Sequence, residues 1–211
     1  MNIFSVIYNL SVLTISGLSL FKAVRYGLKK QFFLSIYLFI TLIVELNAII
    51  HILWFSTTNT YSLYQHYALF CIVFFGYYYY RIFPKNYRYF VLAILIMAFT
   101  VSIMMINFGL VFSFGLGMVV SIAYVLYSLL WYHYGLNNNL DKKISDNPHF
   151  WISSGLLFWG SFYVLKAYPA EYLVEKDPSF HTVLKDINYI VATIMYVLIG
   201  IGLLKLNKQK T

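Results

Sequence analysis

Charged residues are scarce in this chain, and their shortage sets the class of protein. Only 10% of the 211 residues are charged and 61% are hydrophobic, whereas a soluble domain has about 25% charged residues. The mean hydropathy is +0.73. No polar stretch is long enough to fold as a separate soluble domain. We therefore expect residues 1–211 to form one all-α domain that lies in a membrane.

Several motifs of known chemistry are also missing. The sequence has no Gly-rich phosphate loop, no Gly-x-Ser-x-Gly elbow and no His-Glu-x-x-His pair, so it offers no positive ground for naming an enzyme. A retinal Schiff base needs a lysine inside the last span, but Lys185 and Lys205 lie at the two ends of that span. The single cysteine, Cys71, cannot form an internal disulfide, and we interpret it as a small core residue. The amino end lacks a basic region and a cleavage site, so we expect its apolar run to stay as a helix.

Long apolar runs recur along the whole chain. Runs of about 20 residues match the thickness of the hydrocarbon core, and their continuity favours helices over barrel strands. The predicted spans are 3–22, 32–55, 62–82, 89–107, 109–132, 148–168 and 183–204. The turn at 107–109 is the weakest boundary. The sequence thus predicts a seven-transmembrane-helix bundle.

The basic residues predict the orientation of this bundle. Twelve of the 15 fall in alternate connections and in the tail: Lys22, Arg25, Lys29, Lys30, Arg81, Lys85, Arg88, Lys142, Lys143, Lys205, Lys208 and Lys210. Short loops rich in Lys and Arg stay on the cytoplasmic side. We therefore expect the N-terminus outside and the C-terminus in the cytoplasm, and we read the net charge of +8 as a topology signal rather than a nucleic-acid-binding face.

Local signals mark one helix start and one packing face. Asn147 is a predicted N-cap, and Pro148 suits the first helical position. Small residues recur at Ser113, Gly117 and Ser121, a spacing that lets helices approach closely in lipid. We expect this face to pack within the bundle, with a dimer interface as the alternative.

The second span, in the stretch "LIVELNAIIHILWF", carries the only acidic residue in the middle of a predicted span. Glu45 lies near mid-depth, where a charge costs on the order of 3 kcal/mol, so we expect it to face protein or water. Asn47 lies about 160° away around the helix at 100° per residue. These two polar faces predict that other helices surround the second span.

Further polar residues predict a site in the outer half of the bundle. His51 and His66 lie at similar depth near the ends of spans two and three, and Asn188 enters span seven from the same side. With Glu45 and Asn47 they form the candidate ligand-binding or coupling group. Two facing histidines, His51 and His66, suit a metal or a haem, but no tight His spacing is present, so we assign no metal ligands.

Aromatic residues are abundant, with 21 Tyr, 19 Phe and 4 Trp. The run "GYYYYR" (76–81) ends span three, where tyrosine belts gather at the membrane interface. Trp159 is an exception, because it lies well inside span six.

Two stretches carry a resemblance. "NPHFWISSGLLFWGSFYV" (147–164) and the last span, "HTVLKDINYIVATIMYVLIGIGLLK" (181–205), resemble a group of short, uncharacterised bacterial inner-membrane proteins with an Asn-Pro-x-Phe-Trp-Ile opening on helix six. Some of these are thought to be encoded near sensor histidine kinases. The resemblance implies a sensory accessory role in the inner membrane, with a separate signalling protein as partner.

Three functional hypotheses follow. The first is a sensory or ligand-binding membrane module without its own catalytic domain. The second is a small transporter or channel subunit that uses Glu45 for proton or cation coupling. The third, a membrane enzyme acting on lipid, needs Glu45, His51 and His66 to converge on one cavity.

Overall fold

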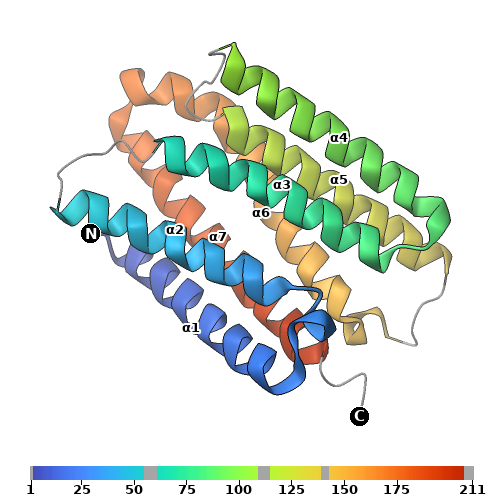
Figure 1. Ribbon diagram of the computed structural model, residues 1–211. Coiled ribbons are helices and arrows are strands. Elements are labelled where there is room, and N and C mark those ends of the chain that lie inside the picture. The colour runs from blue at the N-terminus through green and yellow to red at the C-terminus, as the bar shows by residue number, and fades with distance from the viewer. Residues whose placement is uncertain (1, 55–60, 109–114, 139–142, 207–211) are drawn as a thin grey trace.

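Seven α-helices make up most of the described part of the chain, and Figure 1 shows them in the computed structural model. The structure describes residues 2–54, 61–108, 115–138 and 143–206, and these contain no strand. The helices are α1 (Ile3–Tyr26), α2 (Leu34–Trp54), α3 (Tyr61–Ile82), α4 (Lys85–Asn107), α5 (Gly115–Asn137), α6 (Pro148–Lys176) and α7 (Pro178–Leu206). Two short 3-10 helices, η1 (Leu28–Gln31) and η2 (Ile144–Asp146), precede α2 and α6.

Five of these helices, α1, α2, α4, α5 and α7, are long and apolar enough to cross a membrane. Large apolar side chains also cover the outside of the bundle, among them Ile7, Ile43, Ile96, Met97 and Val197, which are 46–63% exposed. A soluble monomer rarely exposes so large an apolar surface. The all-helical, multi-pass membrane character that the composition predicted is confirmed.

Several helices differ from the predicted apolar runs at their ends. The start predicted for the fifth span, at 109, lies outside the described residues, and α5 runs from Gly115 to Asn137. Helix α6 continues beyond residue 168 to Lys176, and α7 begins before residue 183, at Pro178. Only Asp177 separates the two helices. Hydropathy marks the apolar part of a helix, whereas the backbone continues into polar flanks until a cap ends it.

Two caps show why the chain turns where it does. The predicted start of α6 is confirmed, because Asn147 Oδ1 accepts a hydrogen bond from the backbone N–H of His149 at 2.9 Å. At the start of α7, Asp177 Oδ1 accepts hydrogen bonds from Ser179 Oγ at 2.6 Å and from the Phe180 N–H at 3.0 Å. These two bonds lower the pKa of the Asp177 carboxyl, because they stabilise its ionised form.

Six helices form a closed ring. In order of packing around it they are α1, α7, α6, α5, α3 and α2, and α2 returns to α1. Helix α4 lies outside this ring against α3 and α5, as Figure 1 shows. This arrangement leaves an interior that α4 does not reach.

Small residues allow the close contacts between α5, α6 and α7. A Cβ atom on Gly160 would lie 2.8 Å from the backbone oxygen of Ser121, and one on Gly202 would lie 2.8 Å from that of Pro148. Ser121 is fully buried. The small-residue face predicted on the fifth span therefore packs within the bundle at Ser121, although Ser113 lies outside the described residues.

Aromatic side chains fill the end of the ring that carries the basic residues. Tyr78, Tyr79 and Tyr127 are completely buried. The hydroxyl of Tyr78 lies 2.6 Å from His149 Nδ1, and that of Tyr79 lies 2.8 Å from Ser153 Oγ. The belt interpretation of "GYYYYR" is therefore wrong for Tyr78 and Tyr79, whose helix face points into the bundle.

Helix α2 is not surrounded by other helices, and that prediction is wrong. It packs against α1 and α3, while Phe39, Ile43 and Ile50 on its outer face are 44–49% exposed. Asn47 is on the exposed side as well. One polar residue per face did not require a protein neighbour on each side, because a neutral amide costs far less than a charge outside the bundle.

Candidate ligand-binding cavity

A cavity of about 500 Å³ lies inside the ring, toward the end that carries the N-terminus. Each of the six ring helices contributes to its wall. Its lining residues are Tyr8, Tyr37, Glu45, Tyr64, Gln65, Tyr67, Ala68, Cys71, Leu116, Gly117, Val120, Tyr124, Trp159, Tyr163, Asn188, Tyr189, Ala192, Met195 and Tyr196. Eight of the 19 are tyrosines, so hydroxyl groups and aromatic rings dominate the surface.

Glu45 supplies the carboxyl group of this wall. The hydroxyl of Tyr8, on α1, donates a hydrogen bond to Glu45 Oε1 at 2.8 Å. Tyr64, on α3, also lines the cavity beside the carboxyl group. The side chain is half-buried, and it is held between two helices on either side of its own. A carboxylate at this depth needs such donors, since it has left bulk water.

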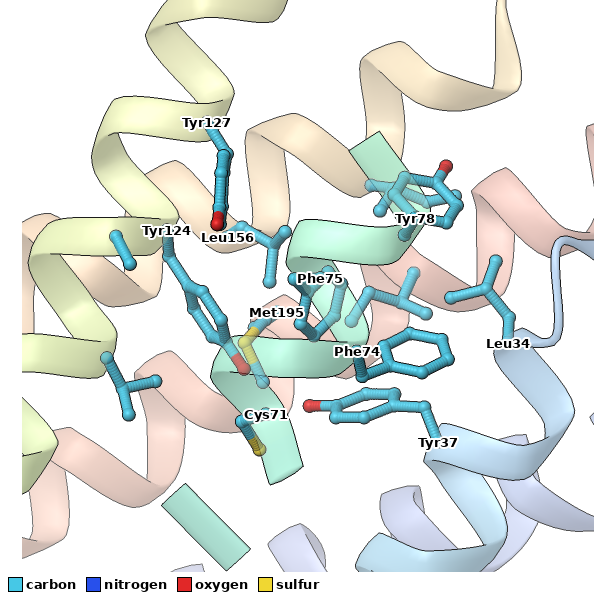
Figure 2. Packing of buried hydrophobic residues seen from close by; sticks show 14 of the residues in the cluster. Leu34, Tyr37, Cys71, Phe74, Phe75, Tyr78, Tyr124, Tyr127, Leu156 and Met195 are labelled. Atoms are coloured by element: carbon cyan, nitrogen blue, oxygen red, sulfur yellow. The ribbon is translucent and has the colours of Figure 1, made fainter. Parts of the chain in front are cut away.

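The inner end of the cavity is a cluster of hydroxyl and sulfur groups. Figure 2 shows the hydroxyls of Tyr37 and Tyr124 directed toward the space beside Cys71 and Met195. Tyr37, Cys71, Tyr124 and Met195 all belong to the lining of the cavity. The interpretation of Cys71 as a small core residue agrees with its 3% exposure. Its side chain nevertheless lines the cavity.

The hydroxyl of Tyr67, which also lines the cavity, is hydrogen-bonded to a residue of α2. Tyr67, on α3, has its hydroxyl 2.7 Å from Thr41 Oγ1. Thr41 is completely buried, and its Oγ1 also donates to the backbone oxygen of Tyr37 one turn earlier. This bond ties α3 to α2, which otherwise packs on α3 only lightly.

The opposite wall is aromatic. The ring of Trp159, on α6, lies 5.7 Å from that of Tyr124 and 5.0 Å from that of Tyr163 between centroids. Tyr163 crosses directly over Gly117, where a Cβ atom would overlap its hydroxyl. Glycine at 117 is therefore what lets Tyr163 lie against α5 and close this side.

The structure separates the five predicted site residues into two groups. Glu45 and Asn188 both line the cavity. Asn47 and His66 are exposed, and His66 Nδ1 lies 2.7 Å from the backbone oxygen of Ser62. His51 is half-buried, and neither it nor His66 is among the lining residues.

The described residues hold no cluster of three or more His, Cys, Asp or Glu side chains with the geometry to bind a metal ion. The arrangement of the cavity instead suits a small organic molecule. Its aromatic rings can pack against apolar groups, while its hydroxyls, amides and carboxylate can orient polar ones.

The tyrosines are the residues that sequence reasoning missed. Tyr8, Tyr37, Tyr124 and Tyr196 are at most 8% exposed, and each lies inside a helix where a membrane protein usually has an aliphatic residue. Their placement along the helices, away from the interfaces, was the available signal, and Trp159 was the one aromatic residue singled out on that ground.

Comparison of the chain with protein-family models, with curated proteins and with solved structures finds no match in any of the three.

Proposed function

We propose that this protein is an integral membrane sensory or ligand-binding protein without its own catalytic domain, and that the tyrosine-lined cavity is its ligand site. The observation that carries the proposal is the cavity itself. Its volume of about 500 Å³ falls within the range of about 300–1,000 Å³ typical of small-molecule sites. Its wall combines apolar rings with a few oriented polar groups, as such sites require.

The closed inner end favours binding over transport. Beyond Tyr37 and Cys71, the ring is filled by Phe75, Tyr78 and Tyr127, each completely buried. A transporter that uses Glu45 for coupling needs a polar route from the carboxylate to both faces of the membrane. On its other side Glu45 borders a groove between α1 and α2 that is lined mostly by apolar residues. The enzyme hypothesis lacks support too, since His51 and His66 do not join Glu45 in the cavity wall.

The direction of the signal follows from the proposed topology. We infer seven spans with the N-terminus outside, because the helix count is odd and basic residues gather at the opposite end of the bundle. The cavity then opens toward the outer side of a bacterial inner membrane. Together with the resemblance of residues 147–164, this supports a sensory module that passes its signal to a separate cytoplasmic protein.

A cavity-filling variant tests the ligand-binding proposal. Ala192 is 5% exposed and lines the cavity, so Ala192→Phe places a ring in the ligand's space. Protein is purified in nanodiscs from its native membrane, and retained small molecules are identified by mass spectrometry. Ala93→Phe, at an exposed position on α4, adds the same ring on the outside of the bundle as the control.

We expect at least one compound to remain with the wild type and with Ala93→Phe and to be lost from Ala192→Phe. An identical set of compounds in all three samples would remove the proposal.

A further inference from the structure

The wall of the cavity has an acidic side chain but no basic one among the described lining residues. Glu45 is the single acidic residue among the 19 described lining residues, and none of them is Lys, Arg or His. A carboxylate away from bulk water is most stable next to a positive charge, because hydrogen bonds from neutral hydroxyls compensate only part of its lost hydration. The cavity therefore has the electrostatics of a cation site.

A second polar group in the wall also lacks a partner. Asn188 Oδ1 is a buried acceptor with no hydrogen-bond partner among the described residues, and Asn188 lines the cavity. Such orphaned groups are rare and call for an explanation. An N–H donor on a bound molecule would satisfy this oxygen.

Aromatic rings surround the carboxylate. The ring of Tyr8, whose hydroxyl binds Glu45, lies 5.6 Å from that of Tyr189 and 5.9 Å from that of Tyr196. All three line the cavity. The faces of aromatic rings attract cations, and desolvation strengthens this attraction.

We propose that the ligand is an organic amine in its protonated form, with an apolar body. This inference deepens the proposed function and rests on it. The ammonium group lies at the Glu45 side, and its N–H groups donate to the carboxylate and to Asn188 Oδ1. The apolar body extends toward Trp159 and Tyr163.

The position of one lysine supports this orientation. Lys166, on α6, is 9% exposed, and its Nζ lies 5.0 Å from the centre of the Tyr163 ring. It does not line the cavity, but it brings a positive charge to the α6 wall. Helix α6 is opposite α2 in the ring, so repulsion from Lys166 and attraction to Glu45 point the ammonium group the same way.

A panel of three probes with one shape tests the chemical class. We would measure binding of 4-phenylbutylamine, 4-phenylbutan-1-ol and 4-phenylbutanoate to the full chain in nanodiscs by calorimetry, and subtract the signal of empty nanodiscs. The three molecules share the apolar body and differ in the charge of the end group. We expect the amine to bind about tenfold or more tightly than the alcohol, since a hydrogen bond to a charged group discriminates by about that factor.

Two substitutions assign this preference to Glu45. Glu45→Gln keeps the shape and an acceptor for Tyr8, and should lower the affinity for the amine to that for the alcohol. Asp186→Asn is the matched control, because it removes one negative charge near the same end, at a residue that does not line the cavity and accepts a hydrogen bond from Asn2 at 2.7 Å. It should leave the preference for the amine unchanged.

The outcomes separate this inference from the proposed function. Equal or tighter binding of the alcohol or the acid by the wild type, or no binding of the amine, overturns the inference even if Glu45→Gln does not fold. Unchanged amine preference in Glu45→Gln overturns it as well. If Ala192→Phe still excludes the native compound in those cases, the cavity remains a ligand site for a molecule of another class.

Discussion

The contact between α5 and α6 allows a stability prediction from a single added methyl group. Gly160→Ala would place a Cβ atom 2.8 Å from the backbone oxygen of Ser121 and 3.1 Å from Cγ2 of Val125. The first of these atoms belongs to a helix backbone, so it cannot rotate away as a side chain can. Relief of the contact requires α5 and α6 to separate.

The expected cost follows from two opposing effects. Overpacking in a well-packed core costs about 1–3 kcal/mol. Alanine regains up to about 1 kcal/mol over glycine within a helix, and less in lipid, where the helix is already fully hydrogen-bonded. We therefore expect Gly160→Ala to lower the free energy of unfolding by about 1–2 kcal/mol.

Gly17→Ala supplies the matched control. A Cβ atom on Gly17, in the middle of α1, meets nothing within 4 Å, so this substitution should be neutral or stabilise by less than about 1 kcal/mol. Unfolding in mixed micelles with rising SDS, followed by tryptophan fluorescence, gives both free energies, and Trp159 lies next to the substituted glycine. Equal stability of Gly160→Ala and Gly17→Ala would refute the reasoning, because the close approach of α5 and α6 would then not exist.

Three further predictions concern the cavity and the start of α7. Tyr8→Phe removes the hydrogen bond to Glu45 Oε1 and should destabilise the protein by about 1–3 kcal/mol, because the acceptor stays half-buried. Gly117→Ala displaces only the far end of Tyr163, so it should leave stability nearly unchanged while it shifts the emission of Trp159 in a variant without the other tryptophans. Asp177 has a lowered pKa, so its stabilising effect on α7 is present at neutral pH and disappears below about pH 4. Asp177→Asn should therefore be less stable than the wild type at pH 7, by a margin that shrinks at about pH 3.

Each of these three predictions has a control variant or an outcome that would contradict it. Tyr26→Phe makes the same change at the other end of α1 and should cost less than Tyr8→Phe; an equal cost would contradict the role of the Glu45 bond. Unchanged Trp159 emission in Gly117→Ala would mean that Tyr163 does not lie across α5. A margin between wild type and Asp177→Asn that stays constant from pH 7 to pH 3 would exclude the proposed cap.

The sequence predicted the elements of the fold well because lipid restricts the choice of structure. Without water, a chain must form its backbone hydrogen bonds within helices, so continuous apolar runs translate directly into helices. The ends of the helices were predicted less accurately where a helix continues into a polar flank, as α6 does to Lys176. The N-cap at Asn147 was predictable because a cap depends on neighbours in sequence only.

The candidate site was predicted in part, and the difference follows from packing. Glu45 and Asn188 were chosen as polar residues in apolar segments, and both line the cavity. Depth alone placed His51 and His66 with them, but depth does not say which way a helix face points. The tyrosines were missed because an aromatic side chain serves equally in a belt, in a core or in a binding site.

The amino-acid sequence by itself determined that the chain is a helical membrane protein with one acidic residue in the middle of its apolar segments. The tertiary structure alone decided that six helices form a ring with α4 outside, and that eight tyrosines from this ring face one cavity. The physical reason is the range of the forces involved. Helix formation in lipid depends on local hydrogen bonds and apolar length, whereas the cavity depends on how the rotated faces of six helices meet.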